Sequence, residues 1–123
     1  FSDGEAWLPV DPAHTARAVD KQASANDSMM GFTRACLSKR KQHIALVAGS
    51  MDLIEAQDDA VLLFMREMGG KKVACAFNLG SAHLHLPDDL QGSLILASRP
   101  EAAAAQAHQS IPSYSGLWIE IEP

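Results

Sequence analysis

The sequence predicts a mainly β protein, an antiparallel β-sandwich of Greek-key type that is preceded by one long helix. Apolar residues within 26–46 recur with the 3.6-residue period of a helix. About six short apolar runs follow at spacings of about 8–12 residues, and turn residues such as the pair at 69–70 separate them. Because no long helical crossover lies between these runs, parallel strand pairing is disfavoured.

The composition sets the class of protein before any element is placed. A chain of 123 residues fits one ordinary domain, and 47% apolar residues are typical of a globular core. A net charge of −5 argues against a nucleic-acid partner, because proteins that bind phosphates concentrate Lys and Arg on one face. No run of about 18 apolar residues occurs, so the sequence predicts no membrane-spanning segment.

The first 25 residues predict an irregular leader. Pro9 and Pro12 favour extended backbone before them, and the segment shows no period. The leader nevertheless carries Trp7, Leu8 and Val10, which are large and apolar for a solvated loop. We therefore expect these three side chains to pack on a surface that another body supplies. The alternative is that they fold back onto the β region.

The helix is predicted to start at Asn26, Asp27 or Ser28, all of which are good N-caps. Its basic end complements the negative end of the helix dipole. One face carries a stripe, widened by Met30, that consists of Met29, Phe32, Thr33, Cys36, Leu37 and Arg40. We expect the apolar residues of this stripe to divide between the β region and a second body.

The later segments alternate with the period of strands. The predicted strands comprise residues 51–57, 60–68, 72–79, 81–86, 93–98 and 116–122, with a short helix at 100–109. Gly69 and Gly70 predict a two-residue hairpin turn. In the last strand, alternation directs Leu117 and Ile119 inward and Trp118 outward.

Residues that could carry chemistry are few. His83 and His85 alternate on one strand, which can seed a metal site, but no third ligand lies nearby in the sequence. The acidic pairs at 58–59 and 88–89 fall in predicted turns, where Asp is favoured in any case. Cys36 and Cys75 lie in apolar runs and predict buried reduced thiols, which favours a cytoplasmic location. We predict no catalytic residue, cofactor or metal site in this chain.

The segment WLPVDP at residues 7–12 is followed about fifteen residues later by DSMMGFTRACLSKRKQHIAL at residues 27–46. Together they resemble the α-glucosidase and oligo-1,6-glucosidase branch of the α-amylase family, glycoside hydrolase family 13. Members typically read WLPVNP and then a helix of the form SVLNFYRRLIALRKxHPAL. The residues in register are Ser28, Phe32, Arg34, Leu37, Arg40, Lys41, His43, Ala45 and Leu46. The chain departs from the pattern at Gly31, Thr33, Ala35, Lys39 and Ile44, and the β region matches more loosely.

The resemblance implies a domain division. Residues 1–46 would be the leader loop and last helix of a truncated (β/α)8 catalytic barrel, and residues 47–123 an antiparallel C-terminal β domain like that of α-amylases. The family's three catalytic carboxylates lie on central barrel strands, and no residue of this chain matches them. The implied partner is the missing barrel of the parent chain, a retaining α-glucosidase-type hydrolase.

Three hypotheses follow for function. The first is a non-catalytic domain that supports the barrel in α-glucan and oligosaccharide metabolism. Its interdomain or self-association surface, bound by the barrel or by a second copy of the chain, would consist of Trp7, Leu8, Val10, Met30, Phe32 and Leu37. The second is a carbohydrate-binding β-sandwich module that uses Trp118 and Tyr114. The third, an enzyme in its own right, has no motif in its favour.

Overall fold

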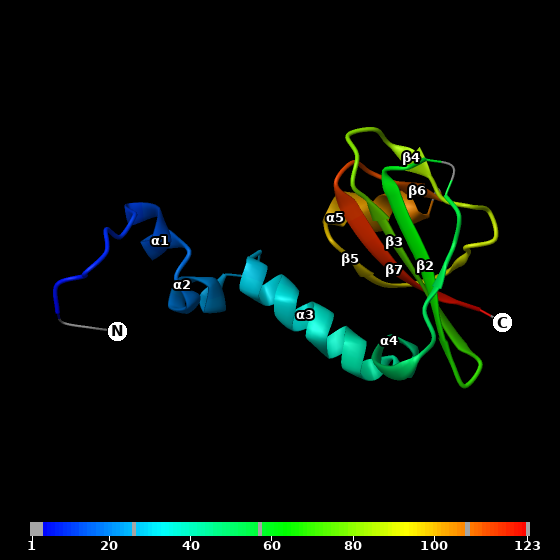
Figure 1. Cartoon of the computed structure of the whole chain (residues 1–123), viewed down its shortest axis with the longest axis horizontal. Helices are drawn as coiled ribbons and strands as arrows, with labels where there is room; N and C mark the ends of the chain where they lie inside the picture. Colours follow the sequence, from blue (N-terminus) through cyan, green and yellow to red (C-terminus); the bar gives the residue numbers. More distant parts are fainter. Residues whose placement is uncertain (1–3, 26, 57, 108, 123) are drawn as a thin grey trace. The chain divides into compact units, whose positions relative to one another are not determined.

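The computed structural model describes residues 4–25, 27–56, 58–107 and 109–122 (Figure 1). The chain divides into two compact units, Phe1–Ala35 and Cys36–Pro123, which are described separately below. Asn26 and Gln57, which bound a predicted helix and a predicted strand, lie outside the described residues. Within the described part of the chain, no helix combines the length and the apolar character needed to cross a bilayer.

The first unit contains two short helices, α1 (Pro12–Ala16) and α2 (Val19–Ser24), and the start of α3 (Met29–Gln42). The prediction of an irregular leader is therefore wrong for these residues. Asp11 caps α1, since its carboxylate accepts the N–H of Ala13 at 2.8 Å, and Pro12 supplies the fixed backbone angle of a first helical turn.

Ser28 lies directly before α3. Its hydroxyl accepts the N–H of Gly31 at 3.1 Å and donates to the carbonyl of Gln22 at 2.9 Å. The side chain of Gln22 in turn accepts the N–H of Met30 at 2.9 Å. Two of the N–H groups at the start of α3 that lack intrahelical partners are thus satisfied by side chains. The predicted cap at Ser28 is confirmed.

The predicted helix does not run unbroken to residue 46. It ends at Gln42, and a separate helix α4 (Ile44–Ala48) follows. His43 between them is extended, with φ −112° and ψ 103°, and its Nδ1 lies 4.0 Å from Oε2 of Glu120. Leu46 and Ala45 are buried on α4, whereas α3 has no buried residue.

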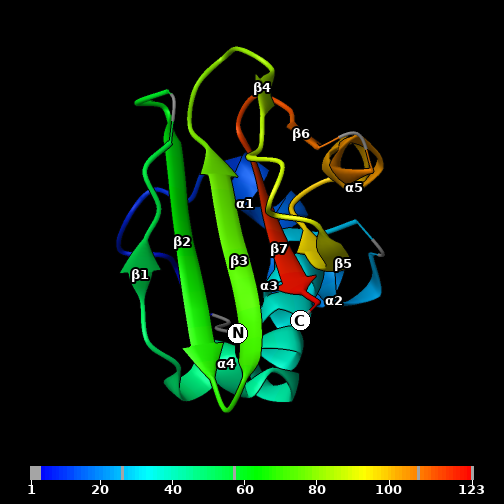
Figure 2. The ribbon, with the colours of Figure 1, turned by 90° about the vertical axis from the view of Figure 1, so that its right-hand side faces the viewer.

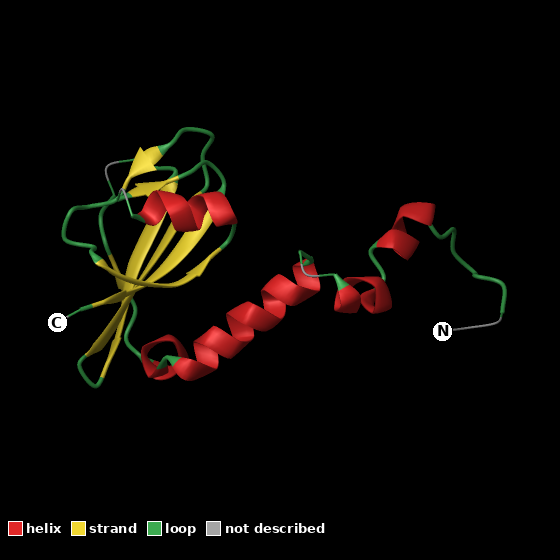
Figure 3. Ribbon diagram, turned by 180° about the vertical axis from the view of Figure 1, so that it is seen from behind, coloured by secondary structure: helices red, strands yellow, loops and turns green. Residues whose placement is uncertain are grey.

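The second unit is built on an antiparallel sheet, which confirms the predicted fold class (Figure 2). Its strands are β1 (Asp52–Leu53), β2 (Val61–Met68), β3 (Lys71–Asn78), β5 (Gly92–Ala97) and β7 (Ser115–Ile121), in the order β1-β2-β3-β7-β5. A second sheet pairs β4 (Leu84–His85) with β6 (Ser110–Ile111). Helix α5 (Pro100–Gln106) joins β5 to β6 and lies against the strands (Figure 3).

The long predicted strands agree with β2, β3, β5 and β7 to within one residue at every end. Gly69 and Gly70 form the expected hairpin turn with φ 60° and 75°, and Met68 pairs with Lys71 across it. The predicted strands at 51–57 and 81–86 are much shorter, because each pairs over only two residues. Strand β6 lies outside the strands that the sequence predicts.

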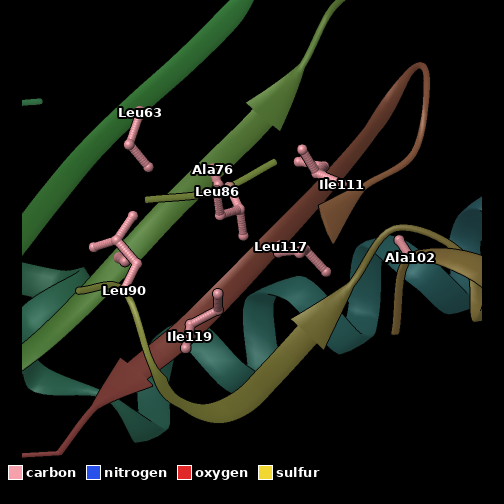
Figure 4. Packing of buried hydrophobic residues seen from close by; sticks show 9 residues of the cluster. Leu63, Ala76, Leu86, Leu90, Ala102, Ile111, Leu117 and Ile119 are labelled. Carbon is pink, nitrogen blue, oxygen red and sulfur yellow. The ribbon is translucent and has the colours of Figure 1, made fainter. Parts of the chain in front are cut away.

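One face of the large sheet is closed. Buried side chains from β2, β3 and β7 meet others from α5, from β6 and from the segment after β4 (Figure 4). This inner cluster consists of Leu63, Ala74, Ala76, Leu86, Leu90, Ala102, Ile111, Leu117 and Ile119. The inward direction predicted for Leu117 and Ile119 is confirmed.

The opposite face carries a smaller helix-side cluster under α4. It consists of Ala45, Leu46, Val73, Cys75 and Ile95. Trp118 packs against this cluster. The prediction that Trp118 points away from Leu117 and Ile119 is therefore right, but the expectation of a solvent-facing ring is wrong, because the ring is half-buried against this cluster.

Candidate interdomain surface

An apolar row crosses all five strands of the large sheet on the α4 side. In antiparallel pairing, residues directly opposite each other share a face. The register joins Leu53 to Phe64, Phe64 to Cys75, Cys75 to Trp118, and Trp118 to Leu96. A second row joins Leu62 to Phe77 and Phe77 to Gly116. These two rows are apolar, whereas the next row on the same face joins Arg66 to Val73 and Val73 to Glu120.

Helix α4 covers only part of this face. Its buried residues pack on Val73 and Cys75, and it contacts β2 and β3. We call the apolar residues of these rows that are not fully buried the open face. They are Leu53 and Leu62, together with Phe64, Phe77, Leu96 and Trp118, which also pack against the helix-side cluster. Leu53 is 72% exposed and Leu62 40% exposed, while the other four are half-buried.

Three local features position the side chains of the open face. The rings of Phe64 and Phe77 stack with centroids 6.1 Å apart and planes at 25°. A Cβ atom on Gly116 would lie 2.7 Å from a ring carbon of Phe77, so the ring lies directly over the β7 backbone. A β-bulge between Leu94 and Leu96 places both Ile95 and Leu96 with the helix-side cluster.

The end of the open face is bounded by two exposed apolar side chains on neighbouring loops. Leu79 directly follows β3 and is 64% exposed, and Tyr114 directly precedes β7 and is 66% exposed. The N–H of Tyr114 donates to the carbonyl of Gly80 at 3.1 Å, which joins the two loops. We call Leu79 and Tyr114 the ridge.

Asn78 holds these loops in place from inside the domain. It is fully buried, and its amide nitrogen donates to the carbonyls of Ala82, Ile111 and Pro112 at 2.8, 3.1 and 3.0 Å. Its amide oxygen accepts the N–H of Gly80 at 2.9 Å. A buried polar side chain that is satisfied on both ends rigidifies its surroundings.

Tyr114 also has an uncommon backbone conformation. Its φ of 49° lies in the left-handed region, which residues other than Gly rarely adopt. The guanidinium of Arg99 donates to the carbonyls of Ser113 and Tyr114, the latter at 2.6 Å. The surrounding hydrogen bonds thus hold the backbone of Tyr114, whose side chain is 66% exposed.

The surface residues expected from the sequence are largely exposed. Trp7, Leu8 and Val10 of the leader are 90%, 55% and 62% exposed. On the helix, Phe32 is 36% exposed and Leu37 55% exposed, while Met30 is half-buried. Their role as a contact surface stays a prediction. Sequence reasoning missed the open face, although the run VACAF at 73–77, apolar on both faces of a strand, could have indicated it.

Reactive groups are not gathered at the open face. Burial raises the pKa of the Cys75 thiol to about 11 and also raises that of Cys36, so neither is an activated nucleophile. His83 and His85 are exposed and line an open cavity of about 410 Å³ with Asp58 and Asp88. Among the described residues, no three His, Cys, Asp or Glu side chains are arranged to hold a metal ion.

The chain shares sequence with known glucosidases. It is 37% identical over 67 residues to the probable oligo-1,6-glucosidase 2 of Bacillus subtilis, a match that covers 54% of this chain and 12% of that protein. It is 35% identical over 79 residues to a probable α-glucosidase of Rhizobium meliloti, covering 64% of this chain and 14% of that protein. The chain is a homologue of the oligo-1,6-glucosidases and α-glucosidases. The resemblance read from residues 7–46 is confirmed.

The fold of this glucosidase homologue is shared with a solved enzyme. The isomaltulose synthase from Klebsiella sp. LX3 superimposes with a TM-score of 0.82 at 19% identity, covering 99% of this chain and 23% of that chain. No family model matches the sequence. The homologue spans 12% and 14% of the length of the two curated relatives above.

Proposed function

We propose that residues 47–123 form the non-catalytic C-terminal domain of an α-glucosidase of the α-amylase family, and that residues 1–46 close its catalytic barrel. In this proposal the β domain supports the barrel through its open face, and the parent enzyme acts on α-linked glucose oligosaccharides. The curated relatives carry glucosidase names, and this chain corresponds to a small share of their length.

The open face is the observation that supports this proposal most. Leu62 is 40% exposed on this face, Phe77 beside it is only half-buried, and the ridge residues next to them are more exposed still. Large contiguous apolar surface usually marks a protein contact. Covering it gains about 25 cal/mol for each Å² of apolar surface removed from water.

The carbohydrate-binding alternative loses one of its two platforms. Trp118 packs against the helix-side cluster and is not free to stack on a sugar ring. Tyr114 is exposed, but sugar-binding faces normally present several aromatic rings. No observation favours this second function over the first.

The test uses the whole natural polypeptide that contains these 123 residues. Leu62→Lys places a charge on the open face. Leu94→Lys is the control, because Leu94 is 36% exposed and Leu62 40% exposed, but Leu94 lies on β5 and pairs with Ile119 of the inner face. We expect the full polypeptide to hydrolyse p-nitrophenyl α-D-glucoside. Leu62→Lys should lower the temperature of half-inactivation by several degrees, and Leu94→Lys should have little effect. Absence of hydrolysis, or equal effects of the two variants, would contradict the proposal.

A further inference from the structure

A pair of histidines lies on the layer that seals the inner cluster. Exposure alternates along residues 83–86, since His83 and His85 are exposed, whereas Leu84 is half-buried and Leu86 is 4% exposed. Both leucines pack with the inner cluster. Because side chains two residues apart in extended backbone point the same way, the two imidazoles project from one side of this segment, away from the core.

The backbone that carries the two imidazoles is fixed on both sides of His85. Leu84 pairs with Ile111 in β4. The N–H of Leu86 donates to the carbonyl of Gln109 at 2.8 Å. At a rise of about 3.3 Å per strand residue, the two histidines lie about 6.6 Å apart along the chain. Rotation about the side-chain bonds can bring one nitrogen of each ring to about 2.0–2.1 Å from a shared metal ion.

The surroundings of the pair also favour a cation. Neither imidazole has a hydrogen bond or an ion pair with another described residue. Both line the open cavity of about 410 Å³, together with Asp58 and Asp88. One carboxylate oxygen of Asp58 accepts the N–H of Ala60 at 2.8 Å, which holds that side chain in its turn. Negative charge that lines a cleft raises the local concentration of cations.

We propose that His83 and His85 chelate one divalent ion of the first-row metals that prefer imidazole, namely Cu²⁺, Ni²⁺ or Zn²⁺. Each ring supplies one nitrogen, and the described residues supply no complete set of three or more ligands. Since a structural zinc site takes four protein ligands and this site offers two, the ion keeps water at its other positions and exchanges readily. The site is independent of the proposed function, because it lies on β4 and not on the open face.

Copper titration of the full natural polypeptide tests this site. Copper(II) sulfate is added in a buffer that does not bind metals, and electron spin-echo envelope modulation identifies the nitrogen ligands of the bound Cu²⁺. His83→Ala and His85→Ala each remove one donor, and His14→Ala on α1 is the matched control. All three side chains are exposed, so the replacements remove no buried contact, and a melting curve checks each variant.

We expect the wild type to bind one more equivalent of Cu²⁺ than either single variant, with modulation from two imidazole nitrogens. His14→Ala should bind as much as the wild type, because a single imidazole closes no chelate ring. Acidification to about pH 5 should release the ion, because protons compete for the imidazole nitrogens. Equal binding by the wild type, His83→Ala and His85→Ala would overturn the proposal. So would a loss in only one of these two variants, since a chelate needs both rings.

Discussion

The two faces of the large sheet differ in how completely they are covered. On the inner side, Leu63 and Ile119 are 1% and 0% exposed, and a layer of β4, β6 and α5 seals them. On the helix side a five-residue helix seals only the strip above Val73 and Cys75. The proposed function therefore assigns the stability of the β unit and its contact with the barrel to separate sets of side chains.

The largest expected effect separates the two faces on a single strand. Leu63→Ala removes a fully buried side chain and should destabilise the chain by about 2–5 kcal/mol, because a cavity remains. Leu62→Ala, its neighbour at 40% exposure, should cost less than about 1 kcal/mol. Urea denaturation followed by far-UV circular dichroism measures both. Similar losses for the two variants would mean that the open face is covered within this chain.

A second variant tests whether the ridge depends on buried hydrogen bonds. Asn78→Ala leaves the carbonyls of Ala82, Ile111 and Pro112 without their shared donor, which should cost about 2–3 kcal/mol. Amide hydrogen exchange of residues 79–82 and 113–115 should accelerate more than exchange in β2. Unchanged exchange at Gly80 would show that Asn78 does not hold the loops.

Cys75 reports on the strip that α4 seals. Its raised pKa means that the unfolded thiol, at 9.0, ionises before the folded one, at about 11. The neutral thiol of Cys75 therefore makes its full contribution to folding stability below about pH 9, and this contribution is lost as the pH rises towards 11. Between pH 8 and pH 10 the wild type should lose about 1.4 kcal/mol more than Cys75→Ala.

Thiol labelling gives an independent control for this prediction. Cys36, which is half-buried, should react with iodoacetamide in the native protein before Cys75, which is 1% exposed. Rapid labelling of both thiols would show that α4 leaves the sheet often. Equal alkaline losses in wild type and Cys75→Ala would mean that the thiol pKa is not raised.

The smallest effect concerns the floor of the open face. Gly116→Ala places a methyl group within 2.7 Å of the Phe77 ring, and the ring must tilt outward. We expect a loss of about 1 kcal/mol, because the exposed side leaves room for the ring to move. Increased binding of a hydrophobic dye, compared with wild type, would accompany the change. No shift of the Phe77 ring resonances would contradict the contact.

Sequence reasoning succeeded where short-range patterns decide the structure. Alternation predicted the positions of β2, β3 and β7. The pair Gly69–Gly70 predicted the hairpin turn that joins β2 to β3. It also indicated that Leu117 and Trp118 face opposite ways. Local chemistry at Ser28 marked the start of α3. In each case the residues that determine the structure lie close together in the chain.

The features that sequence reasoning missed depend on distant residues. The role of Asn78 rests on carbonyls 33 and 34 positions away. The partial burial of Trp118 depends on a cluster that includes residues of α4, and the separation of α4 from α3 at His43 does not follow from the helical period. The open face could not be predicted from the sequence. A continuous apolar run indicates that both sides of a strand are apolar, but it does not indicate which side receives a covering layer.

His43 connects α3 to α4 and also lies close to the large sheet. A single extended residue connects the two helices, and its imidazole lies 4.0 Å from the carboxylate of Glu120 on β7. This contact would link the orientation of α3 to β7. Strand β7 lies between β3 and β5 and carries Leu117 for the inner cluster and Trp118 against the helix-side cluster.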